Sequence, residues 1–368
     1  MSFLAAIGTM SGTSLDGVDV ALIETDGERI ARQGPVGYRP YSADEQALLR
    51  RALAEAAALA DRRARPGAVA AAETMVTAAH AEAIEEFLAK NAIDRRAVAV
   101  IGFHGQTVLH RPEARLTVQI GDGKALARRL KLAVAYDFRA ADVAAGGEGA
   151  PLVPVYHRAL AENLDVPKPL AIVNIGGVAN LTLIVTGRDP VAFDTGPGNA
   201  PIDDLVRART GAAHDVDGRL AAKGRVDEAV VARVLADPFF AKKPPKSLDR
   251  AAFASLPLAD LSVEDAAATA TAVTAASIAR AFDHLPEKPA TIVVTGGGAR
   301  NSTLMSMLRK RLPGRVLRGD NVGWWSDAVE AQAFAYLAVR TLKGLPLTFP
   351  TTTGVPRPLT GGVVAKPD

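Results

Sequence analysis

Short apolar runs that end in polar, glycine-containing turns alternate with longer stretches of helical periodicity along the chain. In the first part the pattern predicts strands over residues 4–9, 18–24, 29–38, 98–103, 116–120 and 133–137, and helices over residues 44–59 and 68–91. The segment 138–154 contains too much glycine for a regular element. Because long loops in compact chains are usually functional or disordered, and apolar residues punctuate this one, we expect an ordered, functional loop.

The second part of the chain repeats this alternation. Strands are predicted over residues 170–174, 181–185, 191–193, 291–295 and 315–318, and helices over residues 200–210, 227–235, 263–282, 302–312 and 326–343. Residues 4–120 and 133–343 thus each begin with a strand meander and continue with helices and strands. This indicates an α/β class with at least partly parallel sheets, and two such halves would leave a cleft between them, where ligands commonly bind.

Composition narrows the classes of protein. The 368 residues, 48% of them hydrophobic, suffice for two domains. The absence of cysteine excludes disulfides and cysteine-ligated zinc and fits a reducing compartment, and six scattered histidines argue against a histidine metal site. A net charge of +3 from dispersed basic residues argues against a nucleic-acid partner. Neither an apolar window of about 18 residues nor a secretory leader pattern occurs, so we expect no membrane association.

Three glycine-rich turns follow apolar strands, at Ser11–Gly17, Ile175–Asn180 and Gly296–Asn301. Successive backbone N–H groups in such turns form anion-binding nests, and glycine allows a ligand to approach closely. Asp16 and Asp19 could hold Mg²⁺ through water, because Mg²⁺ prefers a few carboxylates and keeps much of its hydration. Each turn taken alone could merely reverse the chain, but the three together favour phosphate binding.

The familiar phosphate-binding motifs are absent. The nearest approach to GxxxxGK[ST] is Gly123-Lys124, which Ala125 follows, and there is no GxGxxG, HRD or DFG signature. The remaining possibility for a phosphate-binding scaffold is a nucleotide held by hairpin turns from two related halves of the chain.

Seven motifs resemble those of the 1,6-anhydro-N-acetylmuramic acid kinases. In chain order they are IGTMSGTSLDGVDVAL (7–22), GFHGQTVLHRP (102–112), TVQIGDG (117–123), DFRAADVAAGGEGAPLVP (137–154), NIGGVANLT (174–182), FDTGPGN (193–199) and TGGGARN (295–301). The resemblance implies the fold of the actin/Hsp70/hexokinase type, with two ribonuclease H-like domains and a central interdomain cleft. We expect the N-terminal lobe at 1–130 plus 345–368, and the C-terminal lobe at 131–344.

The resemblance also implies an activity. The family uses ATP to open the anhydro ring of 1,6-anhydro-N-acetylmuramic acid with water and to phosphorylate O6, which gives N-acetylmuramic acid 6-phosphate in cell-wall recycling. It further implies ATP and Mg²⁺ as cofactors, an amino-sugar substrate, a cytoplasmic location and a homodimer. Two alternatives stay open: a kinase for a different sugar on the same fold, and a non-catalytic nucleotide-dependent switch of the Hsp70 or actin type.

The resemblance assigns nucleotide contacts to eight consecutive residues: Gly12, Thr13, Ser14, Leu15, Asp16, Gly17, Val18 and Asp19. The other two glycine turns add further candidate nucleotide contacts, at Gly176, Gly177, Gly296, Gly297 and Gly298.

Two carboxylates are candidates for catalysis. Asp194 follows an apolar strand and precedes a Gly-Pro-Gly turn, and it matches the catalytic aspartate of the family as the base that activates water. Glu330 matches a family glutamate that faces the sugar and the attacking water. Without the resemblance, Asp194 could cap its own turn and Glu330 could interact with a helix dipole. Which carboxylate performs which proton transfer stays open.

Four residues are candidates for contact with the sugar: His104, Gln106, Arg139 and Asn199. Arginine suits the lactyl carboxylate of muramic acid, although His104 and Arg139 could also be structural. Two positions depart from the family pattern, Glu148 where glutamine is usual and Leu248-Asp249 in place of a Thr-Gly pair. The adjacent Trp324 and Trp325 favour core packing or a dimer contact over a role at the cleft.

Overall fold

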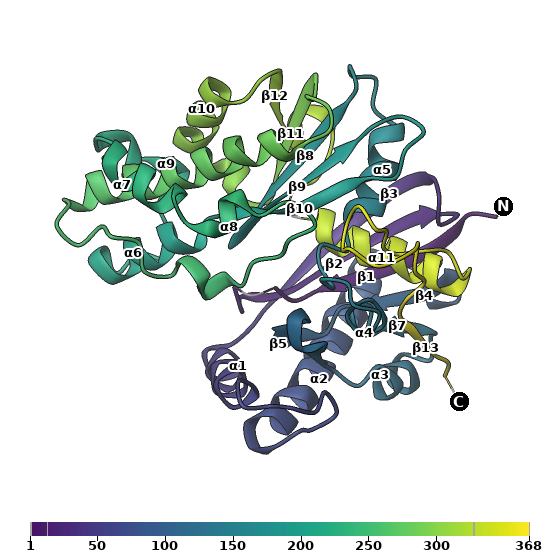
Figure 1. Ribbon diagram of the computed structural model, residues 1–368. Helices are drawn as coiled ribbons and strands as arrows, with labels where there is room; N and C mark the ends of the chain where they lie inside the picture. Colours follow the sequence, from purple (N-terminus) through teal and green to yellow (C-terminus); the bar gives the residue numbers. More distant parts are fainter. Residues whose placement is uncertain (1, 13, 327, 368) are drawn as a thin grey trace. The chain divides into compact units, whose positions relative to one another are not determined.

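The computed structural model describes residues 2–12, 14–326 and 328–367. Its elements form two compact units, Met1–Asn163 with Ala328–Asp368, and Leu164–Asp327 (Figure 1). These boundaries differ from the predicted lobes, because residues 131–163 and the last helix pack with the first sheet. Among the described helices, none is long and apolar enough to cross a membrane.

The first unit contains a six-stranded sheet with the order β13-β7-β4-β1-β2-β3. Its strands are β1 (Leu4–Met10), β2 (Gly17–Thr25), β3 (Ile30–Pro40), β4 (Val98–Phe103), β7 (Val134–Tyr136) and β13 (Val363–Ala365). The first three form an antiparallel meander, and β4 and β7 continue the sheet parallel to β1. A separate hairpin pairs β5 (Gln106–Arg111) with β6 (Leu116–Ile120).

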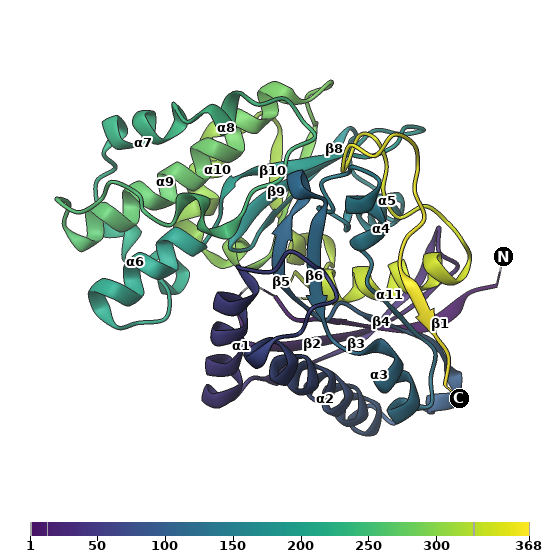
Figure 2. The same cartoon turned by 60° about the horizontal axis from the view of Figure 1, so that its bottom comes forward.

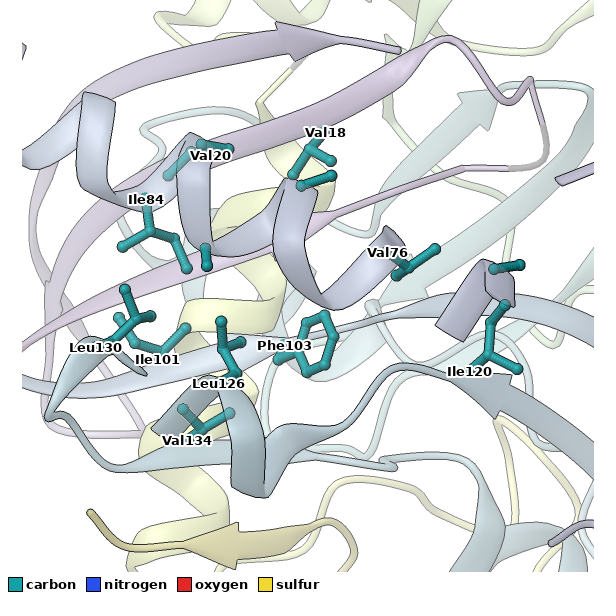
Figure 3. Packing of buried hydrophobic residues seen from close by; sticks show 14 of the residues in the cluster. Val18, Val20, Val76, Ile84, Ile101, Phe103, Ile120, Leu126, Leu130 and Val134 are labelled. Carbon is teal, nitrogen blue, oxygen red and sulfur yellow. The ribbon is translucent and has the colours of Figure 1, made fainter. Parts of the chain in front are cut away.

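Helices cover both faces of this sheet. They are α1 (Ala43–Ala56), α2 (Gly67–Lys90), α3 (Gly123–Leu130), α4 (Ala140–Ala144), α5 (Pro154–Glu162) and α11 (Val329–Leu342), with short 3₁₀ turns at Arg95–Ala97 and Pro112–Ala114. Helices α2 and α3 lie side by side on one face (Figure 2). Apolar side chains of β2, β4 and β7 meet those of α2 and α3 in the core of this unit (Figure 3).

The second unit contains a five-stranded sheet with the order β10-β9-β8-β11-β12. Its strands are β8 (Leu170–Ile175), β9 (Val178–Ile184), β10 (Val191–Pro197), β11 (Thr291–Thr295) and β12 (Arg315–Arg318). Its helices are α6 (Ala200–Thr210), α7 (Glu228–Leu235), α8 (Pro238–Ala241), α9 (Val263–Ala281) and α10 (Ser302–Arg311). The 3₁₀ turns are Val216–Gly218, Ala221–Lys223, Arg250–Phe253, Phe282–His284, Gly297–Arg300 and Gly319–Val322.

Both sheets use the same arrangement, an antiparallel meander whose first strand is extended by two parallel strands. This duplication confirms the predicted α/β class. Local sequence explains many helix starts, since Ser42 and Glu45 form a capping box at α1 and Asp122 caps α3 through two backbone N–H groups.

Some predicted boundaries were wrong. Residues 178–180 were expected in a turn but belong to β9, and residues 194–197 continue β10 instead of turning. Pairing between the two strands extends them, because Asp194 faces Asn180 and Pro197 faces Val178 across the ladder. The predicted helix over 326–343 starts later, at Val329.

Helix α11 packs directly on two glycines of the first sheet. Gly8 and Gly102 are neighbours across β1 and β4. A Cβ atom on Gly8 would lie 1.9 Å from the carbonyl oxygen of Ala331, and one on Gly102 would lie 2.0 Å from that of Phe334. Only a hydrogen at these positions allows such an approach, so the two glycines set the position of α11 and of Glu330 in its first turn.

We expect Gly102→Ala to lower the free energy of unfolding by about 1–3 kcal/mol, because the added methyl group forces α11 off the sheet. Chemical denaturation of the purified protein measures this. Gly12→Ala is the matched control, since its Cβ would meet no atom closer than the Ser14 Oγ at 3.6 Å. Equal stability of the two variants would contradict this account of α11.

Candidate active site

Buried hydrogen bonds fix the start of the loop that joins β1 to β2. The Ser11 hydroxyl donates to the Oε1 of Gln106 at 2.5 Å and lies 3.0 Å from the Tyr41 hydroxyl. The Nε2 of Gln106 donates to the carbonyl oxygen of Gly12 at 3.1 Å. Both polar ends of Gln106 therefore bind the loop, and its predicted contact with a sugar stays a prediction.

The rest of the loop turns sharply before β2 begins. The backbone N–H of Leu15 donates to the Gly12 carbonyl at 3.3 Å, and Leu15 adopts a φ of +57° with its side chain buried. The Ser14 hydroxyl donates to the Oδ1 of Asp16 at 2.6 Å. Gly17 and Val18 open β2, and the Val18 side chain lies in the core, so only its backbone can face a ligand. Thr13 lies outside the described residues.

Three carboxylates concentrate negative charge beside this loop. Asp19 on β2 is half-buried, Asp16 is exposed, and Glu330 lies in the first turn of α11. Burial, followed by the charges of Asp16 and Glu330, raises the pKa of Asp19 to about 7. The structure brings these three residues together within the first unit. Among the described residues no group of three or more acidic or histidine side chains is arranged to hold a metal ion.

His104 and Arg139 form a pair at the end of β4. The Nδ1 of His104 donates to the carbonyl oxygen of Gly105 at 2.9 Å, so its Nε2 can accept from the Arg139 guanidinium at 3.3 Å. Burial and the charge of Arg139 lower the pKa of His104 to about 3, which keeps the imidazole neutral. Arg139 also donates to the carbonyl oxygen of Gly149 at 2.9 Å. A neutral His104 thus orients Arg139 without repelling it.

The glycine-rich loop over 138–154 is ordered by a buried carboxylate. Asp142 accepts from the backbone N–H of Gly149 at 2.7 Å and from the Thr353 hydroxyl at 2.6 Å. The backbone N–H of Glu148 donates to the Thr353 carbonyl at 2.7 Å. These bonds connect the loop to the segment before β13, which sequence reasoning did not link to it.

A cavity of about 260 Å³ lies in the first unit, at the carboxyl ends of β4 and β7. Its lining residues are Arg62, Arg63, Arg65, Glu73, Phe103, His104, Gly105, Gln119, Ile120, Gly121, Tyr136 and Asp137. Ion pairs join Arg62 to Asp137 at 2.5 Å and Arg65 to Glu73 at 2.8 Å. Of these residues sequence reasoning assigned a site role only to His104, although the cluster of basic residues at 62–65 was a visible signal.

In the second unit the structure brings two of the glycine turns, after β8 and after β11, together around Asn199. The backbone N–H of Asn199 donates to the Gly176 carbonyl at 2.7 Å, and its Nδ2 donates to the Ile175 carbonyl at 3.1 Å. The turn after β11 lies beside them, since a Cβ on Gly298 would lie 3.2 Å from the Asn199 Oδ1. Gly177 accepts from Gly198 at 3.0 Å, and Gly296 and Gly297 complete the turn after β11. Asn199 therefore connects the turns.

Asp194 lies on the edge strand β10 and is buried, at 7% exposure. Its Oδ2 accepts from the backbone N–H of Leu248 at 2.8 Å, and its own N–H donates to the carbonyl of Lys246 at 3.0 Å. The pairing register shifts just beyond Asp194, and such irregularities re-aim side chains at functional sites. Because the donor at 248 is a backbone group, the departure from the family pattern there leaves this bond intact.

The remaining sequence candidates fall outside these clusters. Trp324 is buried, whereas Trp325 is 56% exposed. Lys246 was not singled out from the sequence, because nothing local indicates that its chain segment bonds to β10.

Comparisons with known proteins identify the family. The sequence model described as Anhydro-N-acetylmuramic acid kinase matches residues 4–367. Proteins of this name from Rhodopseudomonas palustris strains HaA2 and BisB18 are 59% and 60% identical over 365 residues, which is 99% of this chain and 100% of each of theirs. Component A of (R)-2-hydroxyglutaryl-CoA dehydratase from Acidaminococcus fermentans is similar over 92% of this chain and 99% of its own, with a TM-score of 0.49 and 13% identity. The chain belongs to the anhydro-N-acetylmuramic acid kinase family.

Proposed function

We propose that this chain is an ATP-dependent kinase that converts 1,6-anhydro-N-acetylmuramic acid to N-acetylmuramic acid 6-phosphate. The observation that carries the proposal is family membership over almost the whole chain, residues 4–367. The fold of two similar sheets, each with glycine turns at strand ends, fits a nucleotide-dependent kinase. A kinase of this family would act in peptidoglycan recycling.

The reaction consumes one water and one ATP. The oxygen of water bonds to C1 of the sugar while the bond from C1 to O6 breaks, which opens the anhydro ring. The released O6 bonds to the γ-phosphorus of ATP while the bridging bond to the β-phosphate breaks. The products are the 6-phosphorylated sugar, ADP and one proton, which comes from the attacking water.

The nucleotide phosphates bind the backbone N–H groups of the loop from Gly12 to Asp19. Asp16 and Asp19 would hold Mg²⁺, and they fit this role because both offer hard oxygen ligands and lie close enough for the charge of Asp16 to act on Asp19. Mg²⁺ supplies charge neutralisation for the phosphates when it is bound. Gly176, Gly177, Gly296, Gly297 and Gly298 stay candidate nucleotide contacts.

Asp194 acts as the base that takes the proton from the attacking water. Its hydrogen bond from the Leu248 N–H fixes the carboxylate and favours the ionised form that a base requires. Glu330 is the second carboxylate of the reaction, and it assists the departure of O6 or orients the water. Arg139, held by His104 and the Gly149 carbonyl, binds the lactyl carboxylate of the sugar. Gln106 acts through the loop that it holds.

The direct test mixes purified protein with Mg²⁺, ATP and the anhydro sugar, and follows the 6-phosphate product by mass spectrometry. Parallel reactions with N-acetylglucosamine, N-acetylmannosamine and glucose distinguish this substrate from other sugars. Turnover of the anhydro sugar supports the proposal, whereas turnover of a different sugar alone contradicts it. The homodimer and the cytoplasmic location stay predictions, and sedimentation analysis tests the first.

Asp194→Asn is expected to reduce sugar phosphorylation by about 10²–10⁴-fold, because the amide cannot accept the proton of water. Nucleotide affinity should stay within about threefold, or ~0.7 kcal/mol, since Asp194 does not bind the phosphates. Coupled measurement of ADP release and calorimetric titration with nucleotide separate the two quantities.

Asp189→Asn is the matched control, because Asp189 lies exposed in the turn before β10 and outside the glycine turns. It should behave like the wild type. Full turnover by Asp194→Asn would remove Asp194 from the role of base.

Asp19→Asn is expected to stabilise the ligand-free protein at alkaline pH. The pKa of Asp19 is raised from 3.8 to about 7 in the folded state, so the folded protein binds this proton more tightly than the unfolded chain. The free energy of unfolding of the wild type therefore falls as the pH rises between these two values. The asparagine variant carries no charge at this position and should be more stable by about 2 kcal/mol above this range.

Thermal unfolding of both proteins between about pH 5 and pH 8 measures this difference. The gap in midpoint temperature should widen as pH rises through that range. Glu28→Gln is the control, because Glu28 is an exposed acidic residue of the same unit. A gap that is constant across the range would contradict the raised pKa.

A further inference from the structure

The segment that carries Lys246 covers the open edge of the second sheet. Strand β10 is the last strand of that sheet, so one side of its backbone has no strand partner. The carbonyl of Lys246 accepts from the N–H of Asp194 at 3.0 Å, and two residues later the N–H of Leu248 donates to the Asp194 carboxylate at 2.8 Å. The same short segment thus holds both the backbone and the side chain of Asp194.

A buried cation anchors this segment. Lys246 is 2% exposed, and its Nζ donates to the carbonyl oxygen of Phe239 at 3.0 Å. The ammonium lies 4.5 Å from the ring centroid of Phe239 and 5.8 Å from that of Phe193. Phe193 immediately precedes Asp194, so the lysine side chain spans from its own segment to the strand that bears the carboxylate. Buried lysines are rare because desolvation of the charge is costly, and aromatic faces offset part of that cost.

Among the described residues, two charged groups act on the Lys246 ammonium. Lys242, which follows α8, repels it, and Asp194 attracts it. His284 contacts the same cluster, with its ring 6.3 Å from that of Phe193 and its Nε2 bonded to the Phe240 carbonyl at 2.9 Å. Burial and the charge of Lys242 lower the pKa of Lys246 to about 8, so it remains a cation at neutral and acidic pH.

We propose that Lys246 is a positioning residue for Asp194. Its side chain fixes the segment that donates the Leu248 N–H, and its positive charge favours the ionised form of the Asp194 carboxylate. This inference rests on the proposed function, because it assumes that Asp194 is the base. The lysine does not take part in bond making; it keeps the carboxylate oriented and deprotonated at the pH where the reaction runs.

Two substitutions separate charge from packing. Lys246→Met keeps the length and the apolar contacts with Phe239 and Phe193 but removes the cation. The acidic limb of the pH profile of kcat/KM should then move to higher pH by about one unit, because a neighbouring positive charge no longer favours the anion. At a fixed pH well below this limb kcat/KM should fall roughly tenfold, because a base acts only when it is ionised, while nucleotide affinity stays unchanged.

Lys246→Arg retains the charge and should bring the acidic limb back to within a few tenths of a pH unit of the wild type. Lys243→Met is the control, because Lys243 is exposed and lies outside the aromatic cluster. If Lys246→Met fails to fold, as judged by circular dichroism, Lys246→Gln provides the uncharged comparison.

The assay of the wild type comes first, because it tests the proposed function separately from the proposed role of Lys246. A wild type that forms no 6-phosphate product contradicts the proposed function. The wild type can also be active while its pH profile of kcat/KM has the same acidic limb as those of Lys246→Met and Lys246→Gln. That result overturns the role of Lys246. A purely structural anchor would lower the midpoint of unfolding without moving the acidic limb, and that result also overturns the inference.

Discussion

The burial of the Asp19 carboxylate beside Asp16 and Glu330 is the constraint on which this account depends. Burial, and then the charges of Asp16 and Glu330, makes the ionised form of Asp19 costly and raises its pKa. Gln106 holds the start of the loop beside them through hydrogen bonds to the Ser11 hydroxyl and the Gly12 carbonyl. In the proposed reaction a divalent cation would offset the charge of these carboxylates, and the N–H groups of the loop would bind the nucleotide phosphates.

The fold maintains this charge cluster through close packing. Glu330 reaches the loop because α11 lies against two glycines in β1 and β4, and Asp19 is fixed in register with Tyr38 on β3. The second unit achieves a comparable fixation by other means, since Asn199 gathers its glycine turns and the Lys246 segment holds Asp194. In each unit a buried polar or charged side chain thus fixes a segment that contacts candidate site residues.

Much of the fold was predictable, because apolar alternation and helical periodicity are local signals. The strands over 4–9, 98–103 and 291–295 illustrate this. Elements with weak local signals were missed. Strand β5 mixes polar and apolar residues and pairs with the nearby β6, and α3 is short and basic. Strand β13 depends on its pairing with β7, which lies far away in the sequence. The same limit applies to the site. Motifs identified Asp194 and the loop before β2. They could not identify the bond of Gln106 to that loop or of Lys246 to the strand of Asp194, because these bonds join segments that lie far apart in the sequence.

The charge cluster can be measured directly by NMR titration of protein labelled with ¹³C at the aspartate carboxyl groups, with the Asp19 signal assigned by comparison with Asp19→Asn. The account predicts that Asp19 in the ligand-free protein titrates with a midpoint near 7, and that Mg²⁺ with nucleotide lowers this midpoint by several units. A midpoint near the ordinary value of 3.8 in the ligand-free protein, unchanged by Mg²⁺ and nucleotide, would contradict it.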